Sequence, residues 1–408
     1  MKIVRIIARL NVGGPARHVV WLNAALDDGE FESTLVTGTV PEGEEDMGYF
    51  AEGFGIEPVF IKEMSRELSP KDLTSLWKIY KELRRNKPDI VHTHTAKAGT
   101  VGRVAGFFYR WLTPGTIIGK PRKLKIVHTF HGHVFHSYYG KTKTRVFLFI
   151  EKMLARFASD KIVVISSQQK EEIHRDFAIG NNEQFAIIPL GIDLTPFGNK
   201  TEARREFRHE IGATEDELLV GLVGRVTEIK NIGMFLAAAH NFGEAVESDV
   251  SVRFVIIGDG NLRPDLKSRS IELGLAEKVI FTGSRNDPEV FYAGLDIVAL
   301  TSLNEGTPLS LIEAMASKKP VISTMVGGVK DLLGEKKEES GEYAVCERGI
   351  AVASSDVLGF RSGLKRLIED KTLRVDLAEK GYEFVHAEYS KDRLVTDIKQ
   401  LYRDLVSP

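Results

Sequence analysis

The segment between residues 297 and 323 begins with the apolar run Ile297-Val-Ala-Leu300. The polar loop Thr-Ser-Leu-Asn-Glu305-Gly-Thr-Pro follows, then a stretch of helical periodicity to about Ala316 and a second apolar run, Pro320-Val-Ile-Ser323. This order is typical of a strand–helix–strand unit in a parallel sheet. The same alternation runs through the whole chain, so the sequence predicts an α/β protein built from doubly wound parallel sheets.

The predicted strands form two series. The first comprises Ile3–Ala8, Thr34–Thr37, Val59–Ile61, Ile90–Thr93, Lys125–Thr129, Lys161–Ile165 and Phe185–Ile188. The second comprises Leu218–Val223, Arg253–Ile257, Val279–Phe281, Ile297–Leu300, Pro320–Ser323 and Ile350–Val352. Two Rossmann-like halves in series are therefore expected.

The length also favours two domains, because 408 residues exceed what one hydrophobic core usually serves. Gly and Pro residues punctuate the chain between Pro189 and Ala213. We expect one domain over residues 1–190 and another over residues 191–389. The last helix, Lys391–Val406, has a single apolar stripe and can pack on either half.

The composition excludes several classes of protein. The net charge of 55 − 57 = −2 excludes a polycation that coats nucleic acid. Cys346 is the only cysteine, so an intramolecular disulfide and a cysteine-based zinc site are excluded. Arg5 and Arg9 interrupt the first apolar run, which predicts a strand rather than a signal peptide. No window is apolar enough to span a bilayer, so we expect a cytoplasmic protein, with or without peripheral contact with the membrane.

Charge is unevenly distributed along the chain. The stretch Ile90–Ile150 contains no Asp or Glu and ten Lys or Arg residues. It also carries aromatic residues, among them Phe107, Phe108, Tyr109, Trp111, Tyr138 and Tyr139. One interpretation is a solvated basic face above an aromatic core. The other is a surface for anionic lipid or for an acceptor that carries phosphate.

Two loops that follow predicted strands can bind an anion. Gly13 and Gly14 open a helix that also carries Arg17, and a helix N-terminus presents unpaired N–H groups to an anion. Gly224-Arg225 and Lys230 follow the first strand of the second half. An arginine fork and a lysine can clamp a diphosphate there, although each loop can equally be a simple connection.

The loop after Leu300 is the most informative. Glu305 lies in this loop, and Glu313 lies about two turns into the helix that follows it. Ionised carboxylates accept several O–H bonds, so the two residues suit a ligand rich in hydroxyl groups. The backbone between Gly306 and Leu309 lies at the helix start, where N–H groups attract an anion.

Histidines cluster after another predicted strand, at His128, His131, His133 and His136. No cysteine or acid accompanies them, which does not favour a metal site, and we expect a polar loop at the edge of the sheet. His92 and His94 end the neighbouring strand and are expected at the same edge.

Taken together and in order, these motifs resemble the retaining glycosyltransferases of family 4, which have the GT-B fold of two Rossmann-like domains facing across a cleft. The matching elements are Gly13-Gly14, Thr129-Phe-His131, Pro189-Leu-Gly-Ile-Asp193, Gly224-Arg225 with Lys230, Ile257-Gly-Asp-Gly260, Glu305-x7-Glu313, Pro320-Val-Ile-Ser323 and Val326-Gly-Gly328.

The resemblance implies that the second domain binds the nucleotide-sugar donor. Arg225 and Lys230 would hold the diphosphate, Glu313 would accept from the ribose hydroxyls, and Glu305 would hold the donor sugar. The other residues implied on the donor are Gly306, Thr307, Pro308, Leu309, Ser284 and Arg285, the last two near the nucleobase.

The resemblance assigns the acceptor to the first domain. His131 would lie near the sugar and the acceptor, with His94 beside it, and Gly13 and Gly14 would approach the donor phosphates. The family opens with Gly-Gly-Ala-Glu, whereas this chain has Gly-Gly-Pro-Ala, so Arg17 would substitute for the missing acid. The terminal helix, residues 390–408, would return to the first domain.

The implied reaction is transfer of a sugar, with retention, from a nucleoside diphosphate sugar, UDP-sugar favoured, to an acceptor hydroxyl. A lipid-linked or surface-polysaccharide glycan is the expected acceptor, and no metal cofactor is expected. Alternatives are a nucleotide-sugar 2-epimerase and a non-catalytic scaffold subunit that binds nucleotide sugars. A dinucleotide-linked dehydrogenase fits less well, because Arg263 replaces the third glycine after Gly258 and Gly260.

Overall fold

The computed structural model describes residues 1–11, 14–40, 46–64, 72–131, 141–198, 200–240, 242 and 251–407, without the side chains of residues 141–143. The chain divides into two compact units. The first unit is Met1–Ile192 together with Lys391–Pro408, and the second unit is Asp193–Ser390. Each unit is described by itself.

The first unit is built on a fully parallel seven-stranded sheet. Its strands pair in the order β3-β2-β1-β4-β5-β6-β7. They span β1 Lys2–Arg9, β2 Glu32–Gly38, β3 Val59–Phe60, β4 Ile90–His94, β5 Lys125–Thr129, β6 Lys161–Val164 and β7 Phe185–Ile187. Every strand of the first predicted series is thus present, with ends that shift by at most two residues.

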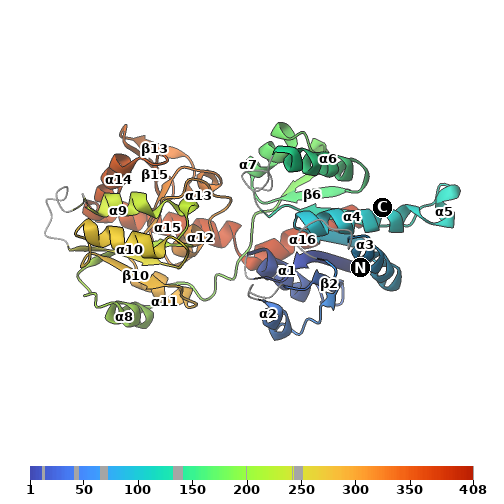
Figure 1. Ribbon diagram of the computed structural model, residues 1–408, viewed down its shortest axis with the longest axis horizontal. Coiled ribbons are helices and arrows are strands. Elements are labelled where there is room, and N and C mark those ends of the chain that lie inside the picture. The colour runs from blue at the N-terminus through green and yellow to red at the C-terminus, as the bar shows by residue number, and fades with distance from the viewer. Residues whose placement is uncertain are drawn as a thin grey trace. The chain divides into compact units, whose positions relative to one another are not determined.

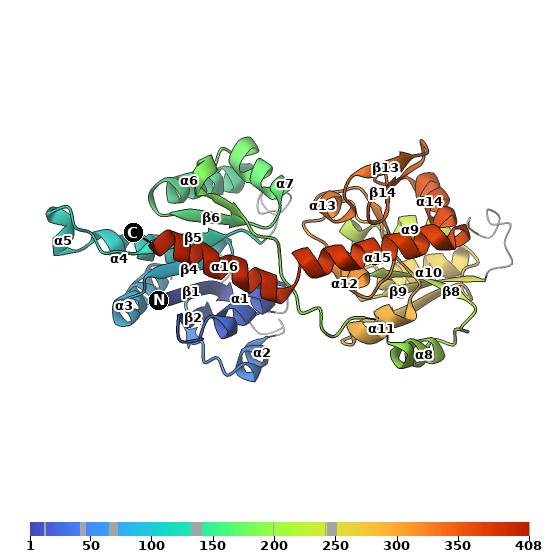
Figure 2. The same ribbon diagram turned by 180° about the vertical axis from the view of Figure 1, so that it is seen from behind.

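Helices cover both faces of this sheet (Figures 1 and 2). One face packs against α3 and α4, and the other packs against α1 and α16, which lies across β1, β4 and β5 in Figure 2. The elements are α1 Gly14–Ala25, α2 Gly48–Gly53, α3 Asp72–Asn86, α4 Ala96–Trp111, α5 Pro114–Ile117, α6 Lys141–Phe157, α7 Ser167–Lys170, the π-helical turn η1 Glu171–Asp176, the 3-10 turn η2 Asn182–Gln184 and α16 Lys391–Val406.

The apolar stripe of α16 explains why this helix joins the first unit. Leu394, Ile398 and Tyr402 are buried against Ile3 and Ile90 of the sheet. At about 25 cal/mol per Å² of apolar surface removed from water, such side chains each stabilise the packed state by roughly 1.5–3 kcal/mol. The helix therefore completes one face of a core that begins at Ile3, near the start of the chain.

The second unit contains an eight-stranded sheet in the order β10-β9-β8-β11-β12-β15-β14-β13. Its strands are β8 Leu218–Val223, β9 Val252–Ile257, β10 Val279–Gly283, β11 Ile297–Leu300, β12 Val321–Thr324, β13 Lys336–Glu339, β14 Tyr343–Cys346 and β15 Ile350–Val352. Its helices are α8 Thr201–Glu210, η3 Glu228–Lys230, α9 Ile232–His240, α10 Arg263–Glu272, α11 Pro288–Gly294, α12 Leu309–Ala316, α13 Val329–Leu333, α14 Val357–Glu369 and α15 Lys371–Glu388.

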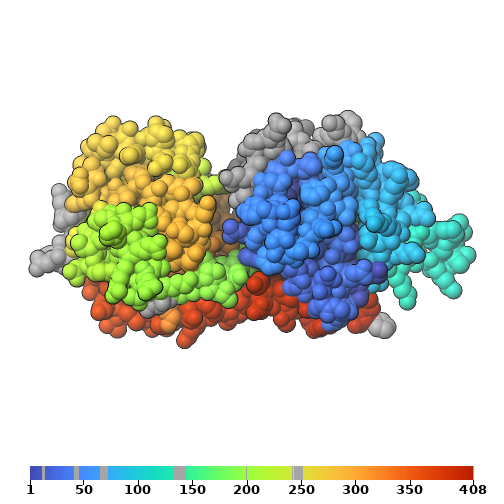
Figure 3. Space-filling model, turned by 90° about the horizontal axis from the view of Figure 1, so that it is seen from below, coloured from blue at the N-terminus to red at the C-terminus, as the bar shows by residue number. Residues whose placement is uncertain are grey.

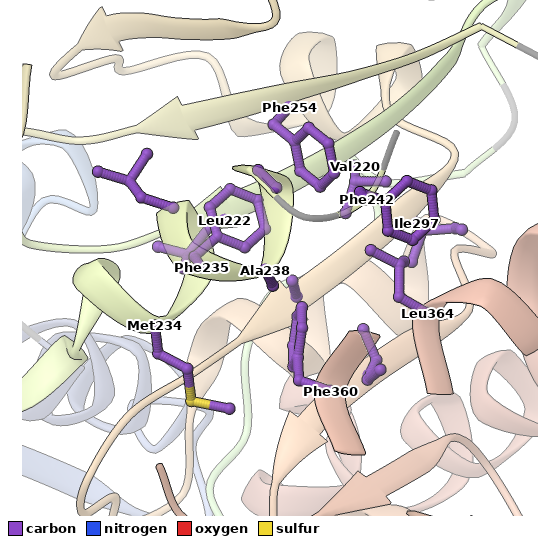
Figure 4. Packing of buried hydrophobic residues seen from close by; sticks show 14 of the residues in the cluster. Val220, Leu222, Met234, Phe235, Ala238, Phe242, Phe254, Ile297, Phe360 and Leu364 are labelled. Carbon is purple, nitrogen blue, oxygen red and sulfur yellow. The ribbon is translucent and has the colours of Figure 1, made fainter. Parts of the chain in front are cut away.

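Aromatic rings form the centre of the second unit's core. Phe235 of α9 contacts Phe254 of β9 and Phe360 of α14 edge-on, with ring centroids 5.4 and 6.3 Å apart (Figure 4). Such edge-to-face contacts contribute energy beyond burial. Cys346, the single cysteine, is buried.

Two strands that the sequence did not predict extend the parallel sheet of the second unit with antiparallel pairs. β14 pairs antiparallel with both β15 and β13, and neither β13 nor β14 was predicted. β13 reads Lys-Lys-Glu-Glu and is exposed throughout, so it has no apolar alternation to mark it as a strand. Charged side chains on an edge strand hinder pairing with other chains.

Candidate functional site

Lys230 and Glu305 meet at the carboxyl edge of the second unit's sheet. Lys230 ends the short η3 turn after β8, and Glu305 follows β11, the next strand of the sheet. The Nζ of Lys230 lies 2.5 Å from Oε1 of Glu305, and Ser302 donates its hydroxyl to the same oxygen at 2.5 Å. Both charged side chains are largely buried, so the structure brings together two residues that the sequence placed 75 positions apart.

Glycines allow the loops at this edge to touch through their backbones. A Cβ on Gly327, which has φ +53°, would lie 1.7 Å from the carbonyl oxygen of Glu305. Gly328 donates its N–H to the carbonyl of Gly306 at 2.9 Å. The loop after β12 therefore fixes the backbone around Glu305, and a side chain at residue 327 would displace it.

The helix α12 begins directly after the loop that carries Glu305. Its eight residues start at Leu309, with Pro308 as the preceding residue, and its first N–H groups have no partner within the helix. Glu313 lies in the second turn, one turn nearer the helix start than expected. Its Oε2 accepts a hydrogen bond of 3.1 Å from the hydroxyl of Tyr292. Burial and the neighbouring carboxylate raise the pKa of Tyr292 well above 10. The phenol therefore stays protonated and orients Glu313.

Three other predicted donor residues of this unit with polar side chains are either exposed or paired with acidic side chains. Arg225 is exposed at the end of β8, and Ser284 is exposed after β10. Arg285 instead contacts Asp287 at 2.6 Å and Glu210 at 2.5 Å, and it lies over the ring of Phe207. No sequence pattern indicated these partners, which hold the guanidinium between α8 and the start of α11.

The first unit carries a chain of polar rings at the carboxyl edge of its own sheet. His92 Nδ1 lies 2.5 Å from the hydroxyl of Tyr402 on α16, and its ring stacks on His94 at 4.3 Å. His94 Nδ1 lies 2.9 Å from Nε2 of His131. The ring of His18, on α1, contacts His131 at 4.8 Å between centroids. Strand alternation explains why His92 and His94 stack, because residues two apart in β4 face the same side of the sheet.

This group of histidines differs from the one that the sequence suggested. His128 faces the other side of the sheet, where its Nδ1 lies 2.9 Å from Thr93 Oγ1 beneath α4. His133 and His136 lie outside the described residues, as does Gly13. Gly14 begins α1 and Arg17 is exposed on it. His18 was the residue missed, although the buried face of α1 could have indicated it.

The histidines are neutral at pH 7. Burial lowers the pKa of His131 from 6.5 to about 4. Burial also lowers the pKa values of His18, His92 and His94 well below 6.5, and the positive charge of Arg5 acts in the same direction. Uncharged imidazoles can donate and accept hydrogen bonds with hydroxyl groups of a ligand.

The neutral histidines make the first unit sensitive to acid. Because the pKa of His131 is lower in the folded state, the unfolded state takes up the proton first as pH falls below about 6.5, and stability declines toward pH 4. His131→Asn should therefore remove about 2 kcal/mol of the loss between pH 7 and pH 4.5. The three tryptophans, Trp21, Trp77 and Trp111, all lie in the first unit, so urea unfolding followed by their fluorescence measures this unit.

The control for this prediction is His209→Asn, on an exposed histidine of the second unit. It should leave the pH dependence of the tryptophan transition unchanged. Equal slopes for wild type and His131→Asn would contradict the assignment of the acid sensitivity to His131.

Three of these histidines can also hold a metal ion. His18, His94 and His131 can each offer one ring nitrogen, and the three nitrogens lie within 4.8 Å of one another. Neutral imidazole is a common metal ligand. The geometry thus permits an ion at a place where the sequence led us to expect no metal.

Comparison with known proteins identifies the family. The model for group 1 glycosyl transferases matches residues 203–384, and the model for Glycosyltransferase Family 4 matches residues 12–196. The chain is a family 4 glycosyltransferase. Each match covers most of one unit and includes the predicted motifs of that unit.

Similar proteins span nearly the whole glycosyltransferase. It is 29% identical over 356 residues, 86% of this chain and 84% of the other, to the Escherichia coli UDP-Gal:alpha-D-GlcNAc-diphosphoundecaprenol alpha-1,3-galactosyltransferase. It is 24% identical over 352 residues, 85% of each chain, to the capsular polysaccharide biosynthesis glycosyltransferase CapM of Staphylococcus aureus.

A solved structure shows the same fold. HepE of Anabaena, in complex with UDP, covers 99% of this glycosyltransferase and is itself covered completely, with a TM-score of 0.77 and 18% identity. The fold predicted from the sequence, GT-B with two Rossmann-like parallel-sheet units, is confirmed.

Proposed function

We propose that this glycosyltransferase moves a sugar, with retention, from a UDP-sugar to a hydroxyl of a lipid-linked or surface-polysaccharide glycan. The contact between Lys230 and Glu305 beside the start of α12 carries the proposal. It combines a cation for phosphate, a carboxylate for sugar hydroxyls and a helix N-terminus for a second anionic oxygen.

The donor occupies the carboxyl edge of the second unit's sheet. Lys230 and the exposed Arg225 bind the diphosphate, and the N–H groups of Gly306, Thr307 and Leu309 donate hydrogen bonds to its other oxygens, with Pro308 setting the turn. Glu313, oriented by Tyr292, accepts from the ribose hydroxyls. Ser284 and Arg285 lie near the end of β10, where the base would be held largely by backbone.

The acceptor reacts on the same face of the sugar that the leaving diphosphate departs from. Charge develops on the diphosphate in the transition state, and prepositioned cations stabilise that charge. The leaving phosphate takes the acceptor's proton in this scheme. Glu305 is bound by Lys230 and Ser302 through Oε1, which suits a binding group better than a nucleophile. The anomeric configuration of the product, determined by NMR, tests retention.

The neutral imidazoles of His94 and His131 serve as hydrogen-bond groups for the sugar and the acceptor in this proposal, and the role assigned to Gly13, Gly14 and Arg17 is to bind the donor phosphates. No metal takes part in the proposed reaction. The lipid-linked acceptor of the Escherichia coli relative supports action at the cytoplasmic face of a membrane. None of the helices in the described ranges is both long and apolar enough to cross a bilayer.

A thermal-shift series tests the donor site. UDP-, GDP- and ADP-sugars are compared by far-UV circular dichroism, because tryptophan fluorescence does not report on the second unit. A UDP-sugar at 100 times its dissociation constant adds about 2.7 kcal/mol of stability. We expect the melting temperature of wild type to rise with the UDP-sugar and not with the GDP- or ADP-sugar. The rise should be the same in the presence and absence of EDTA, and Glu313→Ala should not show it.

Glu379→Ala is the matched control, because Glu379 is an exposed acid of the same unit, paired with Lys318. It should keep the full shift. A thermal shift in Glu313→Ala equal to that of wild type would contradict the proposed role of Glu313 in donor binding. A thermal shift that EDTA abolishes would contradict the metal-independent reaction.

A further inference from the structure

The helix α6 presents an apolar stripe on its outer side. Val146, Phe149, Met153 and Phe157 recur at intervals of three and four residues, and their exposed fractions lie between 43% and 65%. The opposite side of the helix is held to the unit by Glu151, which is buried against Arg103 of α4. A surface helix ordinarily turns its apolar side inward and its polar side to water, so α6 has a second, outward apolar side.

A second exposed apolar segment lies at the end of α4. The short helix α5 projects beyond the rest of the unit (Figures 1 and 3). Ile117 is 89% exposed, and Leu112 and Ile118 are also mostly exposed. An ion pair between Arg110 of α4 and Asp160 joins the base of this segment to the start of β6, three residues after Phe157. The segment and the end of the α6 stripe therefore lie near each other within the unit.

Positive charges border both apolar segments. Arg145, Lys152 and Arg156 are exposed on α6, and Lys120 and Lys123 are exposed after α5. The only acid of α6 is Glu151, which is buried and paired, so it does not offset them. The stretch Ile90–Ile150, which has no acidic residue, carries less positive charge on its surface than its composition indicated. Three of its charges are neutralised within the unit: Lys97 by Asp72, Arg103 by Glu151 and Arg110 by Asp160.

We propose that α6 and the α5 segment form a docking face for the surface of an anionic lipid bilayer. Apolar side chains enter the boundary between headgroups and acyl chains, while flanking lysines and arginines bind anionic headgroups. This inference rests on the lipid-linked acceptor proposed above, and it assigns the membrane contact to named residues of the first unit.

The charges favour a bilayer over a second copy of the chain. A symmetric contact through α6 would bring the same positive side chains of two copies together, because each patch would face its own equivalent. An anionic bilayer instead offers negative charge around an apolar interior. Phe149 and Met153 are therefore expected to insert, and Lys152 and Arg156 are expected to contact the headgroups.

Vesicle flotation tests the docking face. The full chain is mixed with vesicles of phosphatidylcholine containing 30% phosphatidylglycerol, or of phosphatidylcholine alone, at low salt. We expect wild type to float with the anionic vesicles at least tenfold more than Phe149→Asp/Met153→Asp does, and to stay unbound with neutral vesicles. Leu358→Asp/Val375→Asp, on comparably exposed apolar residues of the second unit, should float like wild type.

Two further measurements separate the possible failures. Circular dichroism and the UDP-sugar thermal shift test whether each variant is folded and binds the donor. If wild type shows no thermal shift with the UDP-sugar, that result counts against the proposed function and not against the docking face. Equal flotation of wild type and Phe149→Asp/Met153→Asp would overturn the docking face. So would a wild-type dimer, seen by analytical ultracentrifugation and dissociated by the same substitutions, without vesicle binding.

Discussion

Lys230→Met is expected to lower the turnover of the enzyme by about 100- to 1000-fold, the usual effect of removing one prepositioned group that stabilises developing charge. Lys230 lies beside the proposed diphosphate site, and its charge matters most when the sugar–phosphate bond breaks. The KM for the donor should rise much less than kcat falls. Release of nucleoside diphosphate under saturating donor measures both.

The double variant Lys230→Met/Glu305→Gln separates two roles of this lysine. Lys230 also neutralises Glu305 at 2.5 Å, so its loss leaves a carboxylate that repels the donor. If neutralisation were its whole role, the double variant would recover turnover, whereas a lysine that contacts the diphosphate predicts no recovery. Lys318→Met, on a half-buried lysine of the same unit that pairs with Glu379, should keep full activity. Turnover of Lys230→Met within twofold of wild type would refute the assignment.

Glu151→Ala is expected to lower the free energy of unfolding of the first unit by about 3–5 kcal/mol, because it leaves the guanidinium of Arg103 buried and without its carboxylate partner. Arg103 is 0% exposed, and its Nη2 lies 2.7 and 2.6 Å from the two oxygens of Glu151. Urea unfolding followed by tryptophan fluorescence measures this change in the first unit alone.

Replacing both partners distinguishes the lost interaction from the lost packing. Arg103→Met/Glu151→Leu should recover much of the stability, because apolar side chains can replace a buried ion pair at little cost. Glu32→Ala breaks the exposed pair with Lys2 and should cost no more than about 1 kcal/mol. A loss in Glu151→Ala no larger than that in Glu32→Ala would contradict the prediction.

Strands that are buried on both faces were predictable from the sequence, because they read as short apolar runs. β8, β11 and β15 begin and end at the predicted residues. β13 could not be found in this way, because its four side chains are charged and its place depends only on pairing with β14. Edge strands are defined by a neighbour in space, which a local pattern does not contain.

The candidate site divides in a similar way. Glu305 and Lys230 could be singled out because each follows a predicted strand, and parallel strands bring such residues to one edge. The partners of Arg285 could not, because Glu210 belongs to a helix that precedes the sheet. His18 was also missed, since its contact with His131 joins a helix to the end of a strand that lies more than one hundred residues away.

The return of α16 to the first unit sets the order in which the protein can fold during synthesis. Residues 193–390 must leave the ribosome before α16 can cover Ile3 and Ile90. The second unit can therefore complete its fold while one face of the earlier sheet is still open to water. Nascent chains of this protein thus expose an apolar sheet face until α16 emerges, and chaperones that bind such surfaces have that interval in which to act.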